Sequence, residues 1–167
     1  MKHAKKLIAL TLALICLTLS MSSCATLTIG TLLFSKLNST EDEIEFYHLV
    51  SKSKGDLDNT CEDLYDYWGD FIYDDKYDSA DDAIAAAMKK NEREVETLLE
   101  NDEEIKKLYR EVRDGKYADE VEAVMEAYSD YYTFLMSESW TYNEFPDRQG
   151  DLSNALASAL RKLEMEL

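Results

Sequence analysis

The sequence predicts an all-α fold, an antiparallel bundle of three to four helices behind an N-terminal signal or anchor segment. Apolar residues recur every three or four positions through most of the chain after residue 40. No stretch alternates apolar and polar residues as a half-buried strand would. The connections between the periodic segments are short, so neighbouring helices are expected to run antiparallel.

The first helix is expected to begin at Thr40, because Thr40 and Glu43 have the spacing of a capping box. A bend or short break is expected near Gly55, since glycine weakens a helix interior. Beyond it, apolar residues at alternating spacings of four and three predict a strong helix that ends before Asp74. That stripe consists of Leu57, Cys61, Leu64, Trp68 and Phe71.

The most regular stretch predicts one helix from Ala80 to Asp114, capped at its start by Ser79 and Asp82. Two polar residues, Asn91 and Asp102, lie on its apolar stripe, and Asn101-Asp102 could cap a new start, which allows a kink there. Gly115 is suited to the left-handed conformation that follows a helix, so the helix is expected to end before it.

Two further helices are expected toward the C-terminus. The first runs from about Tyr117 to Ser137, and its stripe consists of Val121, Met125, Tyr128, Tyr132 and Leu135. Residues 141–150 contain Pro146, the one proline of the chain, and are expected to form a loop. A last short helix is expected from Leu152 to the C-terminus.

The N-terminus has the pattern of an export signal. Lysines precede an apolar run from Leu7 to Leu19, and its 13 residues suit a signal core better than a membrane span. Two small residues, Ser22 and Ser23, then precede Cys24. This pattern, Met21-Ser22-Ser23-Cys24, resembles the lipobox of bacterial lipoproteins.

The resemblance implies that residues 1–23 are removed and that Cys24 is acylated, for example with palmitate. The lipid would hold the chain at the cell membrane or outer membrane, with its domain outside the cytoplasm. An uncleaved anchor is the alternative, because Leu7 to Phe34 is long enough to span a bilayer as one helix. Residues 24–39 are then expected to form a membrane-proximal tether, and residues 40–167 one acidic helical domain.

Charge and composition restrict the partners. Residues 24–167 contain 15 basic and 35 acidic residues, a net charge of −20. Such a surface repels phosphates, so a nucleic-acid partner is not expected. Beyond Cys24 the one remaining cysteine is Cys61, which is expected to be a buried apolar residue without a disulfide partner.

The residues that catalysis commonly needs are scarce. His48 is the one histidine beyond Cys24, too few for a zinc site or a nucleophilic triad, so no enzyme, metal or cofactor is expected. The aspartates between Asp74 and Asp82 lack the spacing of a calcium loop and predict a polar turn. Asp56-Leu57-Asp58-Asn59-Thr60 resembles the first motif of haloacid-dehalogenase phosphatases, but the polar residues before it cannot form the required strand.

Aromatic residues close two of the expected helices and could meet at one end of the bundle. Mixed with acidic residues, they could bind a peptide, a cationic group or a protein, although capping of the core is an alternative reason for their presence. The candidate binding residues are Trp68, Tyr73, Tyr77, Tyr131, Trp140 and Tyr142.

Three functions are compatible with these features. The first is a non-catalytic surface lipoprotein that binds a protein or peptide in the cell envelope. The second is a ligand-sensing or solute-capturing module with an aromatic and acidic site at the end distal to the membrane. The third is a hydrolase that uses carboxylates alone, which would need two carboxylates in one cleft.

Overall fold

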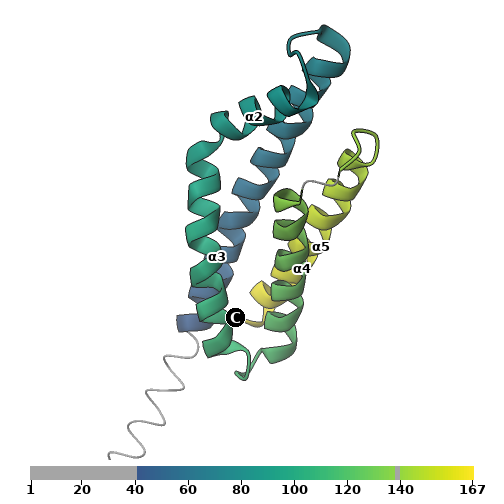
Figure 1. Cartoon of the computed structure of the whole chain (residues 1–167). Helices are drawn as coiled ribbons and strands as arrows, with labels where there is room; N and C mark the ends of the chain where they lie inside the picture. The colour runs from purple at the N-terminus through teal and green to yellow at the C-terminus, as the bar shows by residue number, and fades with distance from the viewer. Residues whose placement is uncertain (1–40, 138–139) are drawn as a thin grey trace, which may run out of the picture. The chain divides into compact units, whose positions relative to one another are not determined.

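The computed structural model describes residues 41–137 and 140–167. These residues belong to a compact unit that spans Thr40–Leu167, and they are all-helical, with five helices and no strand (Figure 1). The first helix covers residues 41–74. The other four are α2 (Ala80–Lys90), α3 (Glu92–Val112), α4 (Ala118–Met136) and α5 (Phe145–Glu166). The expected signal peptide, Cys24 and tether lie outside the described residues.

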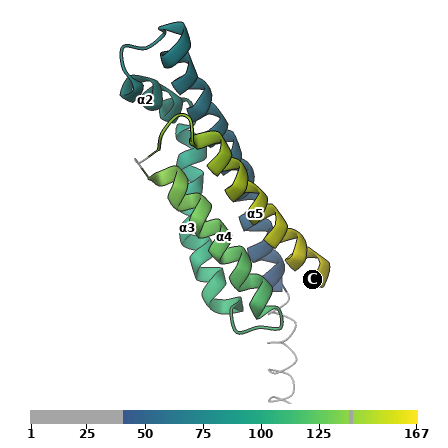
Figure 2. The same cartoon turned by 90° about the vertical axis from the view of Figure 1, so that its right-hand side faces the viewer.

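The helices form a helical bundle. The turned view in Figure 2 agrees with Figure 1 in placing α4 and α5 side by side, with the chain reversing direction between them. The short α2 and the longer α3 return the chain past the helix of residues 41–74. Within the described residues, no helix has the combination of length and apolarity that a membrane crossing requires.

Each helix buries one stripe of apolar residues. On the helix of residues 41–74, the predicted Leu57, Cys61 and Leu64 are buried together with Phe46 and Val50. On α4 the buried stripe differs from the predicted one, because Val124, Tyr131 and Phe134 are buried, whereas Met125 and Tyr132 are only partly buried. The core therefore includes two tyrosines of α4 that lie three residues apart, Tyr128 and Tyr131.

The expected break at Gly55 is wrong, because helix continues through this residue. Val50, Ser53 and Leu57 are fully buried on either side of it. A glycine in a helix costs roughly 1 kcal/mol relative to alanine. Burial of apolar side chains such as Leu57 stabilises the helix by more than that, at about 1.5–3 kcal/mol for a fully buried side chain.

The single helix expected over residues 80–114 is instead two helices, which meet at Asn91. The Asn91 side chain donates a hydrogen bond to the Ala87 carbonyl at 2.9 Å and another to the Asp63 carboxylate at 3.0 Å. Because a side-chain amide competes with the backbone for partners, it favours an interruption here. Asn101 and Asp102 lie within α3, so the helix is not interrupted there. The predicted cap at Ser79 is confirmed, since its hydroxyl accepts from the Asp82 N–H at 3.1 Å.

The expected loop over residues 141–150 is shorter than predicted, because α5 begins at Phe145. Pro146 lies in the first turn of α5, where a helix needs no backbone N–H donor. Proline therefore marks the beginning of a helix here and not a break. This early start brings Phe145 and Gln149 into the bundle.

Candidate functional site

Five aromatic residues converge where the end of the helix of residues 41–74 meets the α4–α5 connection. We call these residues the Tyr142 cluster: Tyr65, Trp68, Tyr73, Tyr142 and Phe145. The Tyr142 ring stacks on Tyr65, with centroids 4.7 Å apart and planes 10° apart. It also meets the edges of Trp68 and Tyr73, with centroids 5.6 Å and 5.9 Å away. Such offset and edge-to-face pairs stabilise aromatic clusters beyond the area that they bury.

Gly69 allows Tyr142 to approach the helix closely. A Cβ atom at position 69 would lie 3.0 Å from the Tyr142 hydroxyl oxygen. Hydrogen bonding to Tyr65 and partial burial raise the pKa of Tyr142 to about 12. The hydroxyl therefore stays protonated at neutral pH, and the cluster presents uncharged phenols beside a strongly acidic surface.

Trp140 holds the connection against the core. Its indole N–H donates to the Phe134 carbonyl oxygen at 2.6 Å, and its ring meets Phe145 edge-on at 5.6 Å between centroids. Phe145 in turn lies 6.2 Å from Tyr65 and stacks on it. The α4–α5 connection is thus joined to the Tyr142 cluster through Phe145.

The six candidate binding residues are not all in one place. Trp68, Tyr73 and Tyr142 are brought together, and Trp140 adjoins them through Phe145. Tyr77 pairs with Tyr67 instead, with ring centroids 5.9 Å apart. Tyr131 is fully buried and cannot present its ring to a partner in this structure. Among the described residues, Tyr73 is the most exposed aromatic residue, with 72% of its surface accessible.

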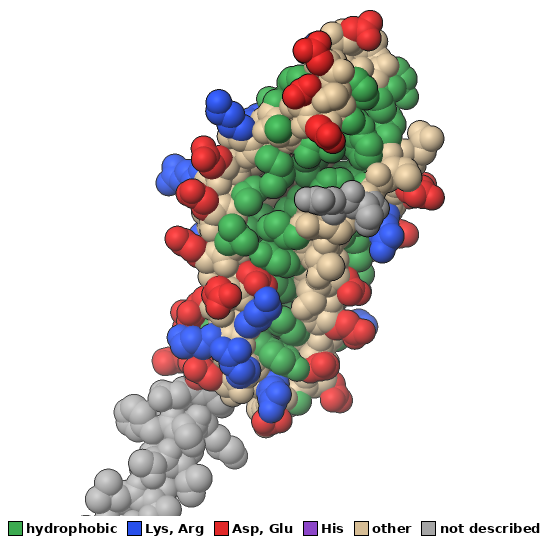
Figure 3. All heavy atoms as spheres, in the orientation of Figure 1, with side chains coloured by type: hydrophobic (Ala, Val, Ile, Leu, Met, Phe, Trp, Pro, Cys, Tyr) green, Lys and Arg blue, Asp and Glu red, His purple; other side chains and the backbone are tan. Residues whose placement is uncertain are grey.

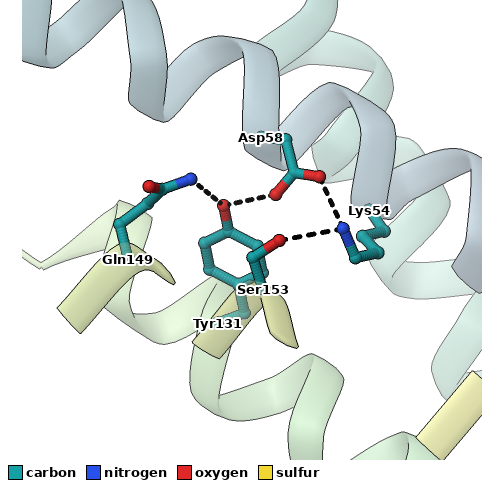
Figure 4. A network of polar contacts seen from close by, with 5 residues as sticks. All are labelled: Lys54, Asp58, Tyr131, Gln149 and Ser153. Atoms are coloured by element: carbon teal, nitrogen blue, oxygen red, sulfur yellow. Dashed lines mark hydrogen bonds and ion pairs between the residues drawn. The ribbon is translucent and has the colours of Figure 1, made fainter. Parts of the chain in front are cut away.

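A polar network below the Tyr142 cluster joins three helices (Figure 4). The buried Tyr131 hydroxyl of α4 donates to Asp58 Oδ1 at 2.7 Å and accepts from Gln149 Nε2 of α5 at 3.0 Å. Lys54 Nζ contacts the other oxygen of Asp58 at 2.6 Å and Ser153 Oγ at 2.9 Å. Since hydrogen bonds join these side chains across three helices, the network fixes their orientation.

A cavity of about 270 Å³ opens between this network and the Tyr142 cluster. Two carboxylates, a thiol, an amide, two aromatic rings and a proline line it: Asp58, Glu62, Cys61, Gln149, Tyr65, Phe145 and Pro146. A second hollow, of about 400 Å³, lies on the α4 side of the connection. Its lining includes both Arg148 and Asp130, whereas no basic side chain is among the described residues that line the first cavity.

The sequence alone did not predict the cavity, because the residues that line it come from segments far apart in the chain. Asp58 and Glu62 lie off the apolar stripe of their helix, and this position predicts exposure to solvent. Gln149 lies in the expected loop, 91 positions after Asp58. One signal was present: Asp58 and Glu62 are four residues apart, which places both carboxylates on one face of a helix.

The described residues in and around the cavity do not form a nucleophilic or metal-binding site. Burial raises the pKa of the Cys61 thiol to about 12, so it remains a protonated apolar group. Residues 56–60, which resemble a phosphatase motif, lie inside a helix and not at the end of a strand. In the part of the chain that the structure describes, no three His, Cys, Asp or Glu side chains are close enough to hold a metal ion.

Comparison of the chain with protein-family models, with curated proteins and with solved structures found no significant match.

Proposed function

We propose that the chain is a lipid-anchored lipoprotein of the bacterial cell envelope that binds a protein or peptide partner and catalyses no reaction. Signal cleavage before Cys24 would leave an acylated cysteine and a short tether. Residues 40–167 would then form an antiparallel helical bundle outside the cytoplasm. The lipobox-like residues 21–24 support the anchoring, and the Tyr142 cluster supports the binding.

The single observation that carries the binding proposal is the exposure of Tyr73 beside the partly buried Trp68 and Tyr142. Tyrosine and tryptophan are enriched at binding interfaces, because they bury a large area and retain a polar group. The site lies about 40 Å along the helix from residue 41, at 1.5 Å per residue. A partner could thus bind it away from the anchored end of the domain.

Hydrophobic side chains also reach the surface elsewhere. Figure 3 shows them gathered in the upper and central part of one face, with acidic and basic side chains around them and across the lower part of the face. A broad apolar area with a charged rim is typical of a protein-binding surface. This distribution favours a macromolecular partner over a small solute alone.

A ligand-sensing or solute-capturing module is the second candidate, and the cavity of about 270 Å³ favours it. A carboxylate hydrolase has less support, although Asp58 and Glu62 share the cavity. Asp58 contacts the Lys54 ammonium at 2.6 Å and accepts from Tyr131. Both contacts hold this carboxylate in the polar network, whereas a hydrolase of this class needs two carboxylates that act on the substrate.

Site-directed photocrosslinking tests the binding proposal. A photoreactive phenylalanine replaces either Tyr73 or Met165, both of which are 72% exposed. Met165 follows Glu164, which contacts Tyr47 near the beginning of the first described helix. It therefore samples the other end of the domain with matched exposure. We expect a discrete crosslinked species from position 73 in intact cells, and none from position 165. Equal crosslinking from both positions, or none from position 73, would contradict the proposal.

A further inference from the structure

We propose that the cavity lined by Asp58, Glu62 and Tyr65 binds an alkyl-ammonium group, the group that a lysine side chain or a diamine carries. This inference rests on the proposed binding function, because it names the chemistry that the partner presents.

The polar lining accepts hydrogen bonds and carries negative charge. Asp58 and Glu62 lie one helical turn apart, and both line the cavity. Each Asp58 oxygen already accepts one hydrogen bond, and a carboxylate oxygen can accept a second. The Gln149 amide nitrogen is used by Tyr131, so its carbonyl oxygen remains as an acceptor. An ammonium group has three donors and no acceptor, so it matches this lining.

Asp58 already holds one ammonium group. Lys54 Nζ contacts it at 2.6 Å and is fixed on its other side by Ser153. Neither Lys54 nor any other lysine or arginine is among the described residues that line the cavity. Because Lys54 offsets the charge of Asp58, Glu62 supplies the net negative charge of the cavity. An anionic ligand would meet this charge with no cation in the lining to offset it.

The apolar walls suit the methylene groups and the charge together. The rings of Tyr65 and Phe145 are nearly parallel, with planes 9° apart and centroids 6.2 Å apart. Aromatic faces attract cations and also contact alkyl chains. The cavity volume is near the low end for small-molecule sites, which run from roughly 300 to 1,000 Å³. A chain of a few methylenes that ends in an ammonium group fits this space better than a drug-sized ligand.

The charge of the whole domain would raise the local concentration of such a ligand. Acidic residues outnumber basic ones by 35 to 18 over the full sequence. A field of this sign steers cations toward the surface and weakens as salt is added. General attraction of this kind is distinct from occupancy of the cavity, and the test must separate the two.

Titration of the full-length chain in non-ionic detergent with 1,5-diaminopentane makes this separation. Trp68 and Trp140 are the two tryptophans of the sequence, and both contact Phe145 of the cavity wall. Their fluorescence therefore reports occupancy. We expect saturable binding that Glu62→Gln weakens about 5–10-fold, since a charge-assisted hydrogen bond is lost. Glu126→Gln removes the same charge at an exposed site of α4 outside the cavity and is expected to leave the affinity unchanged.

A blocked Gly-Lys-Gly peptide separates the two sources of the ammonium group. Binding of the peptide that depends on Glu62 supports both this inference and the peptide partner. Binding of the diamine but not the peptide supports the inference and contradicts a lysine-bearing peptide as the ligand of this cavity. Absence of saturable binding by either probe, or equal weakening by Glu62→Gln and Glu126→Gln, would overturn the inference. Crosslinking from position 73 would be unaffected by that failure.

Discussion

Replacement of Tyr131 by alanine is expected to lower the free energy of unfolding by about 3–5 kcal/mol. The ring is fully buried in α4, and its removal would leave a cavity between α4, α5 and the helix of residues 41–74. Tyr131→Phe retains the ring and removes the hydroxyl, so Gln149 loses a partner and Asp58 keeps only Lys54. This variant is expected to cost about 1–2 kcal/mol.

Urea titrations followed by circular dichroism measure both values, with Tyr73→Ala as the control. Tyr73 is exposed, so its truncation is expected to change the free energy of unfolding by less than about 0.5 kcal/mol. If Tyr131→Ala cost no more than Tyr73→Ala, the buried network would not hold the three helices together. A larger loss of stability for Tyr131→Ala than for Tyr73→Ala would also show that Tyr131 belongs to the core and Tyr73 to the exposed surface.

Replacement of Glu43 by alanine is expected to lower the free energy of unfolding by about 1–3 kcal/mol. Glu43 is 1% exposed and lies against the turn between α3 and α4, where its carboxyl faces the backbone amides of Lys116 and Tyr117. Its carboxyl thus lies beside the first turn of α4, whose N-cap residue, Tyr117, makes no side-chain cap of its own. Glu41→Ala, at an exposed position of the same helical turn, is the control.

A substitution at Gly115 tests the same contact between Glu43 and the turn between α3 and α4. A Cβ atom at this position would lie 2.6 Å from Glu43 Oε1 and 2.9 Å from the Val112 carbonyl oxygen. Gly115→Ala is therefore expected to destabilise the fold, because the backbone oxygen cannot move away cheaply. Gly55→Ala, with no atom within 4 Å, is expected to stabilise it by about 0.5–1 kcal/mol through helix propensity. The two glycine-to-alanine substitutions should thus change the free energy of unfolding in opposite directions.

The pH dependence of Glu43 adds a second readout. Burial raises the pKa of its carboxyl above 4.5, although the amides of Tyr117 and Lys116 oppose the shift. The folded chain therefore binds this proton more tightly than the unfolded chain. Its contribution to stability is full below pH 4.5 and is lost as the pH rises through the raised pKa. Burial shifts the pKa of Asp56 in the same direction.

Denaturation midpoints across this pH range check the sign. The wild type is expected to gain more stability on acidification than Glu43→Gln, which has no proton to bind at this position. The pKa of Asp63 shifts the other way: burial would raise it, but hydrogen bonds from Lys90 and Asn91 lower it. Asp63 is unchanged in both proteins and cancels in the comparison. An identical pH dependence of the two proteins would contradict the role of Glu43.

The sequence predicted the helical class well, because apolar periodicity depends on residues within one helix. Leu57, Cys61 and Leu64 are buried as their spacing indicated. Local signals failed where distant residues decide the outcome. Gly55 does not break its helix, since the residues on either side of it are buried. Asn91 does interrupt the helix that was expected over residues 80–114. Its hydrogen bond to Asp63, 28 positions earlier, depends on how the helices pack, which periodicity does not show.

The candidate site was predicted in part. The convergence of Trp68, Tyr73 and Tyr142 agrees with the expected meeting of two helix ends. Tyr131 was placed with them because it is one of three aromatic residues in the last two turns of α4, and periodicity did not identify it as part of the buried stripe. The cavity needed the position of Gln149, which depends on the early start of α5 at Phe145.

The proposal that the domain is held at a membrane depends on Cys24, and intact-mass spectrometry of the protein purified from bacterial membranes tests it most directly. We expect a chain that begins at Cys24 and carries fatty acyl groups on that residue. A Cys24→Ser variant is expected to lose the acyl mass and to remain uncleaved. A wild-type chain that retains Met1 through Ser23 and carries no acyl group would contradict the account.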